Sequence, residues 1–285
     1  MTKYPLAALL VLLAAACSDQ RTETSTSAKS PAAASATPAA AVPAAVTGTP
    51  PLPQTLTPTA VPEAQIPAAQ RLPGKLTEAW RWQDANGENL LVVYLTGPRP
   101  DVPLDPRARN DGDDGYQEQQ QQLAARQYVR QPGQPYRELW HLRDEVRHCA
   151  FDLDLALLPH TTTVTDLDHD GQTETTLLYF QECRSDVSPD DLKLILHEGT
   201  TKYALRGYTV VQFDSVPARQ RQPAEPCCLD RLTKQELRQA YNAPNAPHMG
   251  RYFNETDFRQ QPEFLRFARQ QWQRYSVFDA AEQAK

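Results

Sequence analysis

Large hydrophobic residues alternate with polar residues in two stretches near residue 80. The stretches 76–83 (LTEAWRWQ) and 89–96 (NLLVVYLT) flank Asp84-Ala-Asn-Gly87, and an Asn-Gly pair between alternating runs predicts a β-hairpin. Similar runs predict further strands at 136–147, 162–165, 175–181, 192–197 and 202–212. Only short turn signals separate these runs, with no pattern long enough for a crossover helix, so we expect the strands to pair antiparallel.

The hydrophobic period changes beyond Pro226 and predicts helices over 233–241 and 262–275. Pro262 suits the first turn of the second helix. One stripe of that helix carries the large apolar side chains, namely Phe264, Leu265, Phe267, Ala268, Trp272 and Tyr275. We interpret the stripe as core rather than as a cofactor or membrane surface. The predicted fold class is therefore mainly β, an antiparallel sheet with C-terminal α-helices packed on it, α+β overall.

The stretch from Gly97 to Gln122 lacks this alternation. It contains four prolines, the cluster Asp111-Gly-Asp-Asp-Gly115 and the run Gln119 to Gln122. This composition predicts a surface loop with a little strand at its end. Strands on both sides of so long a loop can still pair, because the entropy cost of closing a loop grows only logarithmically with its length.

The N-terminus has the pattern of a bacterial export signal. Lys3 precedes an apolar run from Tyr4 to Ala16, and Leu13-Ala-Ala-Ala-Cys17 resembles a lipobox, although its leucine lies four residues before the cysteine rather than three. We predict a lipoprotein signal over residues 1–17, with Cys17 lipidated and attached to the membrane. Because Ser18 rather than aspartate follows, the outer membrane is the expected location. The alternatives are a plain secretory signal and an uncleaved anchor.

Residues 18–70 are predicted to form a disordered tether. Ala, Pro, Thr and Ser make up 37 of these 53 residues and aromatic residues are absent, so the segment cannot bury enough surface to offset its chain entropy. A glycosylated stalk or a peptidoglycan-crossing arm is the alternative. Residues 71–285 are then a single globular β-rich domain, helical from about residue 230.

The charge balance excludes two classes of protein. With 29 basic and 35 acidic residues the formal net charge is −6, whereas a dedicated nucleic-acid binder needs a basic face to neutralise phosphates. Only the extreme N-terminus could enter a bilayer, which excludes a polytopic membrane protein.

The sharpest motif is the acidic loop Asp166-Leu-Asp-His-Asp-Gly-Gln-Thr-Glu174. Calcium prefers several oxygen ligands at about 2.3 to 2.6 Å, often around a glycine that makes a sharp turn. The loop offers such ligands at alternating positions, namely Asp166, Asp168, Asp170, the carbonyl of Gln172 and Glu174. It looks like the strand-loop-strand calcium loop of FG-GAP and integrin-type repeats, but it occurs once, so a propeller is not predicted. The alternatives are an empty acidic turn and a catalytic carboxylate cluster.

Four cysteines follow Cys17. An even number in an exported chain predicts disulfides, and Cys149 with Cys183 is the natural pair because both end predicted strands that flank the acidic loop. Cys227 and Cys228 are adjacent and could form a vicinal disulfide, bridge to the other cysteines or stay reduced. A zinc site is a weaker interpretation, since no CxxC or compact Cys/His set is present.

The central part of the chain resembles a family of exported Bacteroidota proteins labelled surface polysaccharide biosynthesis protein. The resemblance rests on an ordered set of blocks: 149–155 (CAFDLDL), 164–174 (VTDLDHDGQTE), 183–189 (CRSDVSP), 192–194 (LKL) and 202–207 (KYALRG). It takes in Ala79-Trp-Arg-Trp82 and covers most of residues 75–275. His169, Gln172 and the Cys227-Cys228 pair depart from the family pattern. The resemblance implies a role in surface glycan production and assigns no catalytic residues.

No enzyme motif stands out. The six histidines are dispersed, and GxSxG, HExxH and glycine-rich phosphate loops are absent from the sequence. Several carboxylates beyond the loop could supply a glycosidase-like pair, but a turn before the next strand is the simpler interpretation; they are Glu182, Asp186, Asp190 and Asp191. Lys202 and Arg206 should share one sheet face, which is either a solvated face or a site for an anionic glycan.

Together these observations favour a lipid-anchored envelope protein that supports surface polysaccharide biosynthesis or display by binding, with calcium held in the acidic loop. An envelope enzyme acting on glycans through the acidic residues between Asp166 and Asp191 is the second hypothesis. A scaffold that contacts only other envelope proteins is the third.

Overall fold

The alternating runs form two antiparallel sheets in the computed structural model of the chain, which describes residues 54–101, 118–211, 217–242 and 248–277. The fold of the described residues is thus mainly antiparallel β with a few helices, as expected. The predicted signal, Cys17 and the tether up to residue 53 lie outside the described residues. No helix among the described residues is long and apolar enough to cross a membrane.

The first sheet is built on the predicted hairpin. Its strands are β2 (Thr59–Ala60), β3 (Lys75–Asp84), β4 (Gly87–Leu95), β5 (Arg99–Pro100), β6 (Gln119–Arg130) and β7 (Arg137–Cys149). They follow the order β2-β3-β4-β6-β7, with β5 also paired to β6. Asp84 pairs with Gly87 across the two-residue turn, and the positive φ of Gly87 (116°) explains why glycine stands there. The hairpin prediction is confirmed.

Strand β6 confirms the little strand predicted at the end of the 97–122 stretch and extends it to Arg130, while residues 102–117 of that stretch lie outside the described residues. Gln119 to Gln122 begin a 12-residue strand that pairs with β4 on one side and β7 on the other. Gln121 and Gln127 are buried in it. The alternation pattern does not reveal the full strand because polar side chains are buried in it; the Gln127 amide, for example, donates to Asn89 Oδ1 at 2.9 Å inside the protein rather than to water.

The second sheet carries the acidic loop. Its strands are β1 (Gln54–Thr55), β8 (Asp152–Leu157), β9 (Thr163–Asp166), β10 (Glu174–Arg184), β11 (Asp191–Glu198) and β12 (Thr201–Tyr208). The central strand β10 pairs with β11 along one edge and with β9 and β8 in succession along the other. Four of these strands match the predicted ones, and β8 is a strand that the alternation analysis missed.

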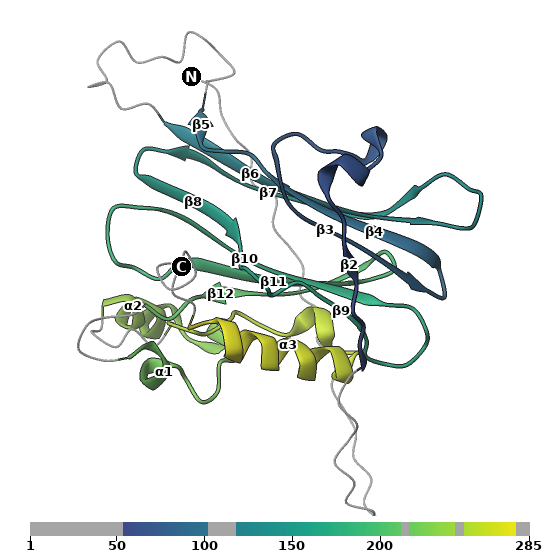
Figure 1. Cartoon of the computed structure of the whole chain (residues 1–285). Coiled ribbons are helices and arrows are strands. Elements are labelled where there is room, and N and C mark those ends of the chain that lie inside the picture. Colours follow the sequence, from purple (N-terminus) through teal and green to yellow (C-terminus); the bar gives the residue numbers. More distant parts are fainter. Residues whose placement is uncertain (1–53, 102–117, 212–216, 243–247, 278–285) are drawn as a thin grey trace, which may run out of the picture. The chain divides into compact units, whose positions relative to one another are not determined.

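The two sheets pack face to face, as the two layers of arrows in Figure 1 show. Alternate residues of each strand enter the core between them, including Leu91 and Val93 of β4 and Leu177 and Tyr179 of β10. The intervening residues of β4 and β10 face outward and are also buried, in two further clusters. Both outer faces must therefore be covered by other parts of the chain.

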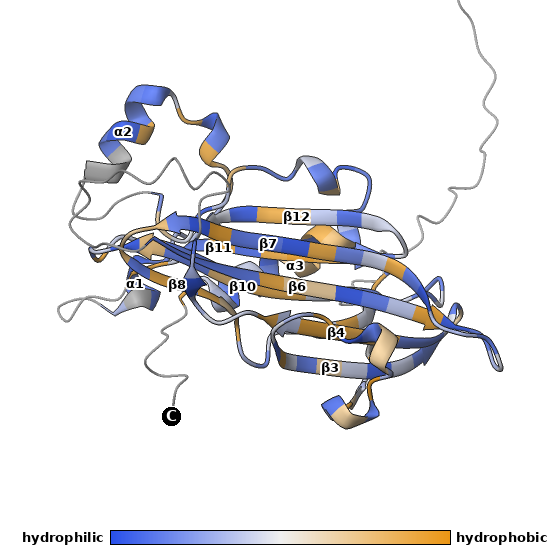
Figure 2. Ribbon diagram, turned by 90° about the horizontal axis from the view of Figure 1, so that it is seen from above, coloured by the Kyte–Doolittle hydropathy of each residue, from blue (hydrophilic) through white to orange (hydrophobic). Residues whose placement is uncertain are grey.

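Helix α3 (Pro262–Tyr275) covers the outer face of the second sheet. Phe264, Phe267, Ala268 and Trp272 belong to one buried cluster with β10, β11 and β12, and Leu265 and Tyr275 pack against it. The predicted stripe is thus core. Among their described side chains, the other helices, α1 (Ala218–Arg221) and α2 (Lys234–Asn242), contribute none to that cluster, and the described part of α2 is largely hydrophilic in Figure 2.

The segment 54–70 covers the outer face of the first sheet and was expected in the tether. It contributes β1, β2 and the short helices η1 (Glu63–Gln65) and η2 (Ala68–Gln70). Val61 and Ile66 are buried against Leu90, Val92 and Tyr94 of β4. The tether prediction is wrong for this segment, because a few apolar residues among many prolines and alanines suffice when a sheet face lies beneath them.

Candidate metal site

The acidic loop connects β9 to β10 as a tight turn. Asp166 ends β9 and Glu174 begins β10, where it pairs with Thr165. His169 (φ 63°) and Gly171 (φ 85°) both adopt left-handed backbone, which reverses the chain within these few residues. The glycine is thus required by the turn itself, and the loop lies between strands rather than helices, as predicted.

The loop brings four predicted carboxylates together. Ligand atoms of Asp166, Asp168 and Glu174 lie within 4.8 Å of one another, and those of Asp168, Asp170 and Glu198 form a second such group. Asp168 belongs to both groups and links them. Glu198, the last residue of β11, is a site residue that sequence reasoning missed. Its only local signal is the Gly199 turn that follows, because its partners lie more than twenty residues away.

Glu174 is the most constrained of these carboxylates. Its side chain is 0% exposed, and Oε2 accepts hydrogen bonds from Thr165 Oγ1 at 2.8 Å and from the Leu167 amide at 2.9 Å. Its other oxygen, Oε1, is buried without a hydrogen-bond partner. Burial raises the pKa of Glu174 to about 8. An unpaired buried carboxyl oxygen costs free energy, which a bound cation or a proton would recover.

Two further carboxyl oxygens of the site are buried and unpaired like Oε1 of Glu174. Oδ1 of Asp166 and Oε1 of Glu198 are buried and have no hydrogen-bond partner. The pKa of Glu198 rises to about 7, first because of burial and then because Asp168 and Asp170 lie close by. Converging carboxylates raise one another's pKa when no cation separates them. The two groups that share Asp168 therefore contain three unsatisfied oxygens, two in the group of Asp166 and Glu174 and one in the group of Glu198.

Gln172 closes the loop by a different contact from the predicted one. Its backbone amide donates to Asp170 Oδ1 at 2.7 Å, and its side-chain amide donates to Oδ2 at 2.8 Å. Its side-chain oxygen accepts from Asn86 Nδ2 at 3.0 Å. Gln172 thus holds Asp170 in place, while ligation through its carbonyl stays a prediction.

The first sheet holds the loop from the side. Asp84 Oδ2 accepts from Thr173 Oγ1 at 2.7 Å, the Ala85 amide donates to the Gly171 carbonyl at 2.8 Å, and Trp82 Nε1 donates to Thr173 Oγ1 at 2.8 Å. These contacts join the β3–β4 turn to the loop. The position of the carboxylates is therefore set by both sheets rather than by the loop alone.

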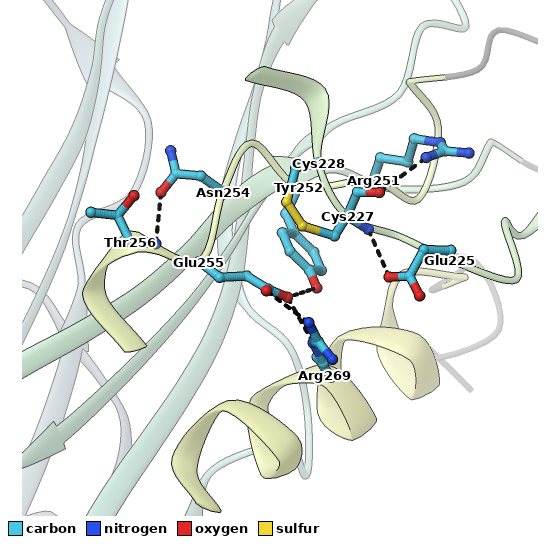
Figure 3. The surroundings of a disulfide bond; sticks show 9 residues. All are labelled: Glu225, Cys227, Cys228, Arg251, Tyr252, Asn254, Glu255, Thr256 and Arg269. Atoms are coloured by element: carbon cyan, nitrogen blue, oxygen red, sulfur yellow. Dashed lines mark hydrogen bonds and ion pairs between the residues drawn. A yellow bond between two sulfur atoms is a disulfide. The ribbon is translucent and has the colours of Figure 1, made fainter. Parts of the chain in front are cut away.

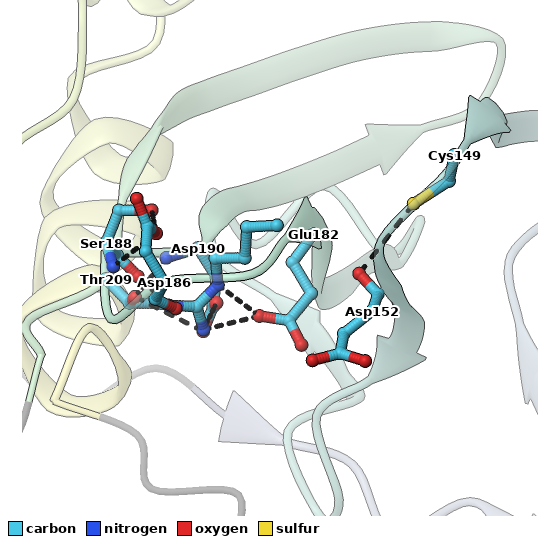
Figure 4. Close-up of polar contacts among 8 residues, drawn as sticks. Cys149, Asp152, Glu182, Asp186, Ser188, Asp190 and Thr209 are labelled. Carbon is cyan, nitrogen blue, oxygen red and sulfur yellow. Dashed lines mark hydrogen bonds and ion pairs between the residues drawn. The ribbon is translucent and has the colours of Figure 1, made fainter. Parts of the chain in front are cut away.

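Glu182 at the end of β10 and Asp190 just before β11 form a separate acidic cluster, shown in Figure 4. Arg184 donates to Glu182 Oε2 and to Asp190 Oδ1, each at 2.5 Å. Burial, together with Glu182, raises the pKa of Asp190 to about 7. A glycosidase pair needs carboxyls about 5 to 9.5 Å apart across a substrate. Here both carboxyls converge on one guanidinium, which argues against that role.

The remaining candidates near this cluster are not brought together. Asp186 accepts from the Ser188 amide at 3.0 Å and forms the predicted turn, and Asp191 contacts Gln181 instead. Lys202 and Arg206 are both exposed on β12, as expected for residues four apart on one face of a strand.

The cysteines form the expected pair and a vicinal one. The Cys149–Cys183 disulfide joins β7 of the first sheet to β10 of the second, with Cα atoms 5.6 Å apart. Cys227 is bonded to Cys228, and Figure 3 shows Glu255 beside them. Both oxygens of Glu255 pair with Arg269 at 2.7 Å. With both sulfurs in a disulfide and Glu255 in an ion pair, this group does not present the ligands of a zinc site.

Comparison with protein-family models, with curated proteins and with solved structures finds no match to this chain. The chemistry of the site therefore has to be inferred from its own residues.

Proposed function

We propose that the protein is a calcium-binding, β-sheet binding protein of the cell envelope, and that Asp166, Asp168, Asp170, Glu174 and Glu198 hold the ion. One observation carries the calcium assignment. A fully buried glutamate, Glu174, has one unpartnered carboxyl oxygen, and its carboxyl group lies within 4.8 Å of ligand atoms of Asp166 and Asp168. Such an arrangement costs free energy as an empty turn and becomes favourable around a cation.

The donor set favours calcium over other common metals. All five ligand side chains are carboxylates, which suit hard cations, whereas zinc and copper favour nitrogen or sulfur ligands. Calcium accepts six to eight oxygens in a flexible geometry, while magnesium demands near-ideal octahedral geometry and usually keeps several waters. A site with five protein carboxylates, four from the loop and Glu198 from β11, therefore fits calcium better than magnesium.

Calorimetry and thermal unfolding of the purified full chain test this proposal. We expect calcium to bind with measurable heat and to raise the melting temperature by several degrees at a hundredfold excess over Kd, a stabilisation of about 2.7 kcal/mol. Magnesium should give a smaller shift. Glu174→Gln preserves the shape of the side chain and should abolish the calcium response. Glu145→Gln changes an exposed residue of β7 and should retain the response. No heat and no shift at millimolar calcium would remove the metal from the proposal.

The envelope role rests on the sequence. Lipidation of Cys17 would place the protein on the outer membrane, and the resemblance to the surface-polysaccharide family supports a role in glycan production or display by binding. Mass spectrometry of the mature N-terminus tests the first point, and an unmodified peptide that begins at Met1 would contradict it. The convergence of Glu182 and Asp190 on Arg184 favours this binding role over the glycan-enzyme alternative.

Substitution of the loop distinguishes the hypotheses in cells. If Asp168→Asn with Asp170→Asn lowers the melting temperature while surface glycan persists at matched abundance, the loop has a structural role. Loss of glycan at matched abundance and unchanged melting temperature would instead favour the enzyme. A scaffold is favoured if crosslinking recovers envelope proteins without glycan.

A further inference from the structure

A groove lies where β3 meets β4, lined mainly by polar residues on the face of the first sheet that points away from the second sheet and, in its smaller part, also by Leu56 and Trp82 of the inter-sheet cluster. It consists of two depressions of about 540 and 440 Å³ that share Gln83 and Glu88 in their walls. Gln83, Glu88 and Arg130 are direct cross-strand neighbours on β3, β4 and β6. They form a row on the same face as Leu90 and Tyr128, just beyond the apolar residues that segment 54–70 covers.

Two arginines frame the centre of the groove. Glu88 Oε1 lies 2.8 Å from Arg130 Nη2 and 3.6 Å from Arg81 Nε, and it also accepts from the Tyr136 hydroxyl. The Arg130 guanidinium lies 4.5 Å from the centre of the Tyr136 ring, which holds it in one orientation. Two guanidiniums against one carboxylate leave a net positive charge, and Arg130 has five N–H donors in a rigid fork. The groove therefore favours binding of an anion, and a carboxylate best matches the fork geometry of the guanidinium.

The rest of the lining is rich in neutral groups that both donate and accept hydrogen bonds. Gln83, Gln131 and Gln134 contribute carboxamides to the larger depression, and Thr57 and Thr59 contribute hydroxyls to the smaller one. Gln131 is held in place because its side chain donates to the Asn86 carbonyl at 2.8 Å. Pro132 and Pro135 supply C–H surface in the larger depression, and Leu56 and Trp82 supply apolar surface in the smaller one. Hydroxyl-rich ligands need such paired donors and acceptors, whereas peptides and lipids need larger apolar pockets.

We propose that this groove binds an acidic oligosaccharide, with a sugar carboxylate against Arg130 and neighbouring sugar hydroxyls on the glutamine amides. The two depressions on either side of Glu88 offer room for more than one sugar unit. The proposal rests on the binding role proposed above, but it does not depend on calcium, since none of the five proposed ligands lines the groove.

Titration of the purified full chain with tetragalacturonate tests the proposal, with cellotetraose as the neutral comparison. We expect tetragalacturonate to bind and cellotetraose to bind at least tenfold more weakly, about 1.4 kcal/mol. Arg130→Ala should weaken tetragalacturonate binding at least tenfold. Arg143→Ala removes the same charge from an exposed position outside the groove and should leave binding unchanged.

Each other outcome overturns the proposal. Absence of tetragalacturonate binding at millimolar concentration, equal binding of cellotetraose, or equal affinity of the Arg130→Ala and parent chains would each exclude the acidic-sugar site. A melting curve of Arg130→Ala that matches that of Arg143→Ala verifies that lost binding does not reflect unfolding. Repeating the titration with Glu174→Gln distinguishes the two proposals, because the groove should still bind the sugar if the calcium assignment fails.

Discussion

The carboxyl group of Asp190 is held in an environment that opposes its ionisation. Its pKa is raised from 3.8 to about 7, mainly by burial and also by Glu182, although Arg184 acts in the opposite direction. The folded protein therefore keeps a proton that the unfolded chain releases between these two values. This proton stabilises the fold fully below pH 3.8, and the contribution is lost as the pH rises through about 7.

Asp190→Asn imitates the protonated carboxyl at every pH. We expect the stability of this variant, relative to the parent chain, to improve between about pH 4 and pH 7 and to level off above that, because in this range the unfolded parent has released a proton that the folded parent still holds. Chemical unfolding at several pH values measures the difference, with Asp152→Asn as the control for a nearby exposed carboxylate. A difference that stays constant or reverses would mean that Asp190 is ionised and paired with Arg184 throughout.

At the same scale, the acidic loop shows how much a residue pattern can specify. Asp166, Asp168, Asp170 and Glu174 were predicted from spacing alone, and their carboxylates do converge. Glu198 could not be predicted in this way, because it joins the group only through the pairing of β11 with β10. Spacing along the chain defines a turn, whereas ligands from another hairpin depend on strand register.

Among the secondary-structure elements, α3 makes a testable contribution to stability. Phe264 is 0% exposed in the cluster that joins the helix to the second sheet. Phe264→Ala should lower the free energy of unfolding by about 3 to 5 kcal/mol, because it leaves a cavity in a packed core. Gln270→Ala, on the exposed side of the same helix, should change it by less than about 0.5 kcal/mol. Equal effects in denaturant unfolding would show that the helix does not stabilise the sheet.

The Cys149–Cys183 disulfide closes a loop with a sequence separation of 34. Replacement of both cysteines by alanine should lower the free energy of unfolding by about 4 kcal/mol, because the unfolded chain gains the entropy that the crosslink removed. Denaturant unfolding under non-reducing conditions measures the loss. If the double variant were as stable as the parent, the bond would not be formed in the mature protein.

At the scale of the whole molecule, the residue at which the folded domain begins affects its stability. A chain that begins at residue 54 keeps Val61 and Ile66 over the first sheet, whereas a chain that begins at residue 71 exposes Leu90, Val92 and Tyr94. We expect the shorter chain to melt at a lower temperature and to aggregate, since an uncovered apolar sheet face favours association. Thermal unfolding and light scattering of both chains test this. Identical behaviour would support the predicted boundary at residue 71.

Some features were determined by the sequence alone, since a short stretch of residues encodes each of them. The β3–β4 hairpin follows from alternation around Asn86-Gly87, helix α3 from its apolar stripe, and the acidic turn from carboxylates spaced around Gly171. In each case the period of the pattern or the demand of a turn restricts the backbone directly.

Other features were decided only by the tertiary structure. Strand β6 begins with four polar residues yet lies in the middle of a sheet. The Pro- and Ala-rich segment 54–70 is ordered by the sheet face beneath it. Arg81 and Arg130 come from separate strands and both lie beside Glu88. Burial and pairing between distant segments supply the free energy for each of these. No local pattern records which surfaces will bury one another, so these features emerge only when the sheets assemble.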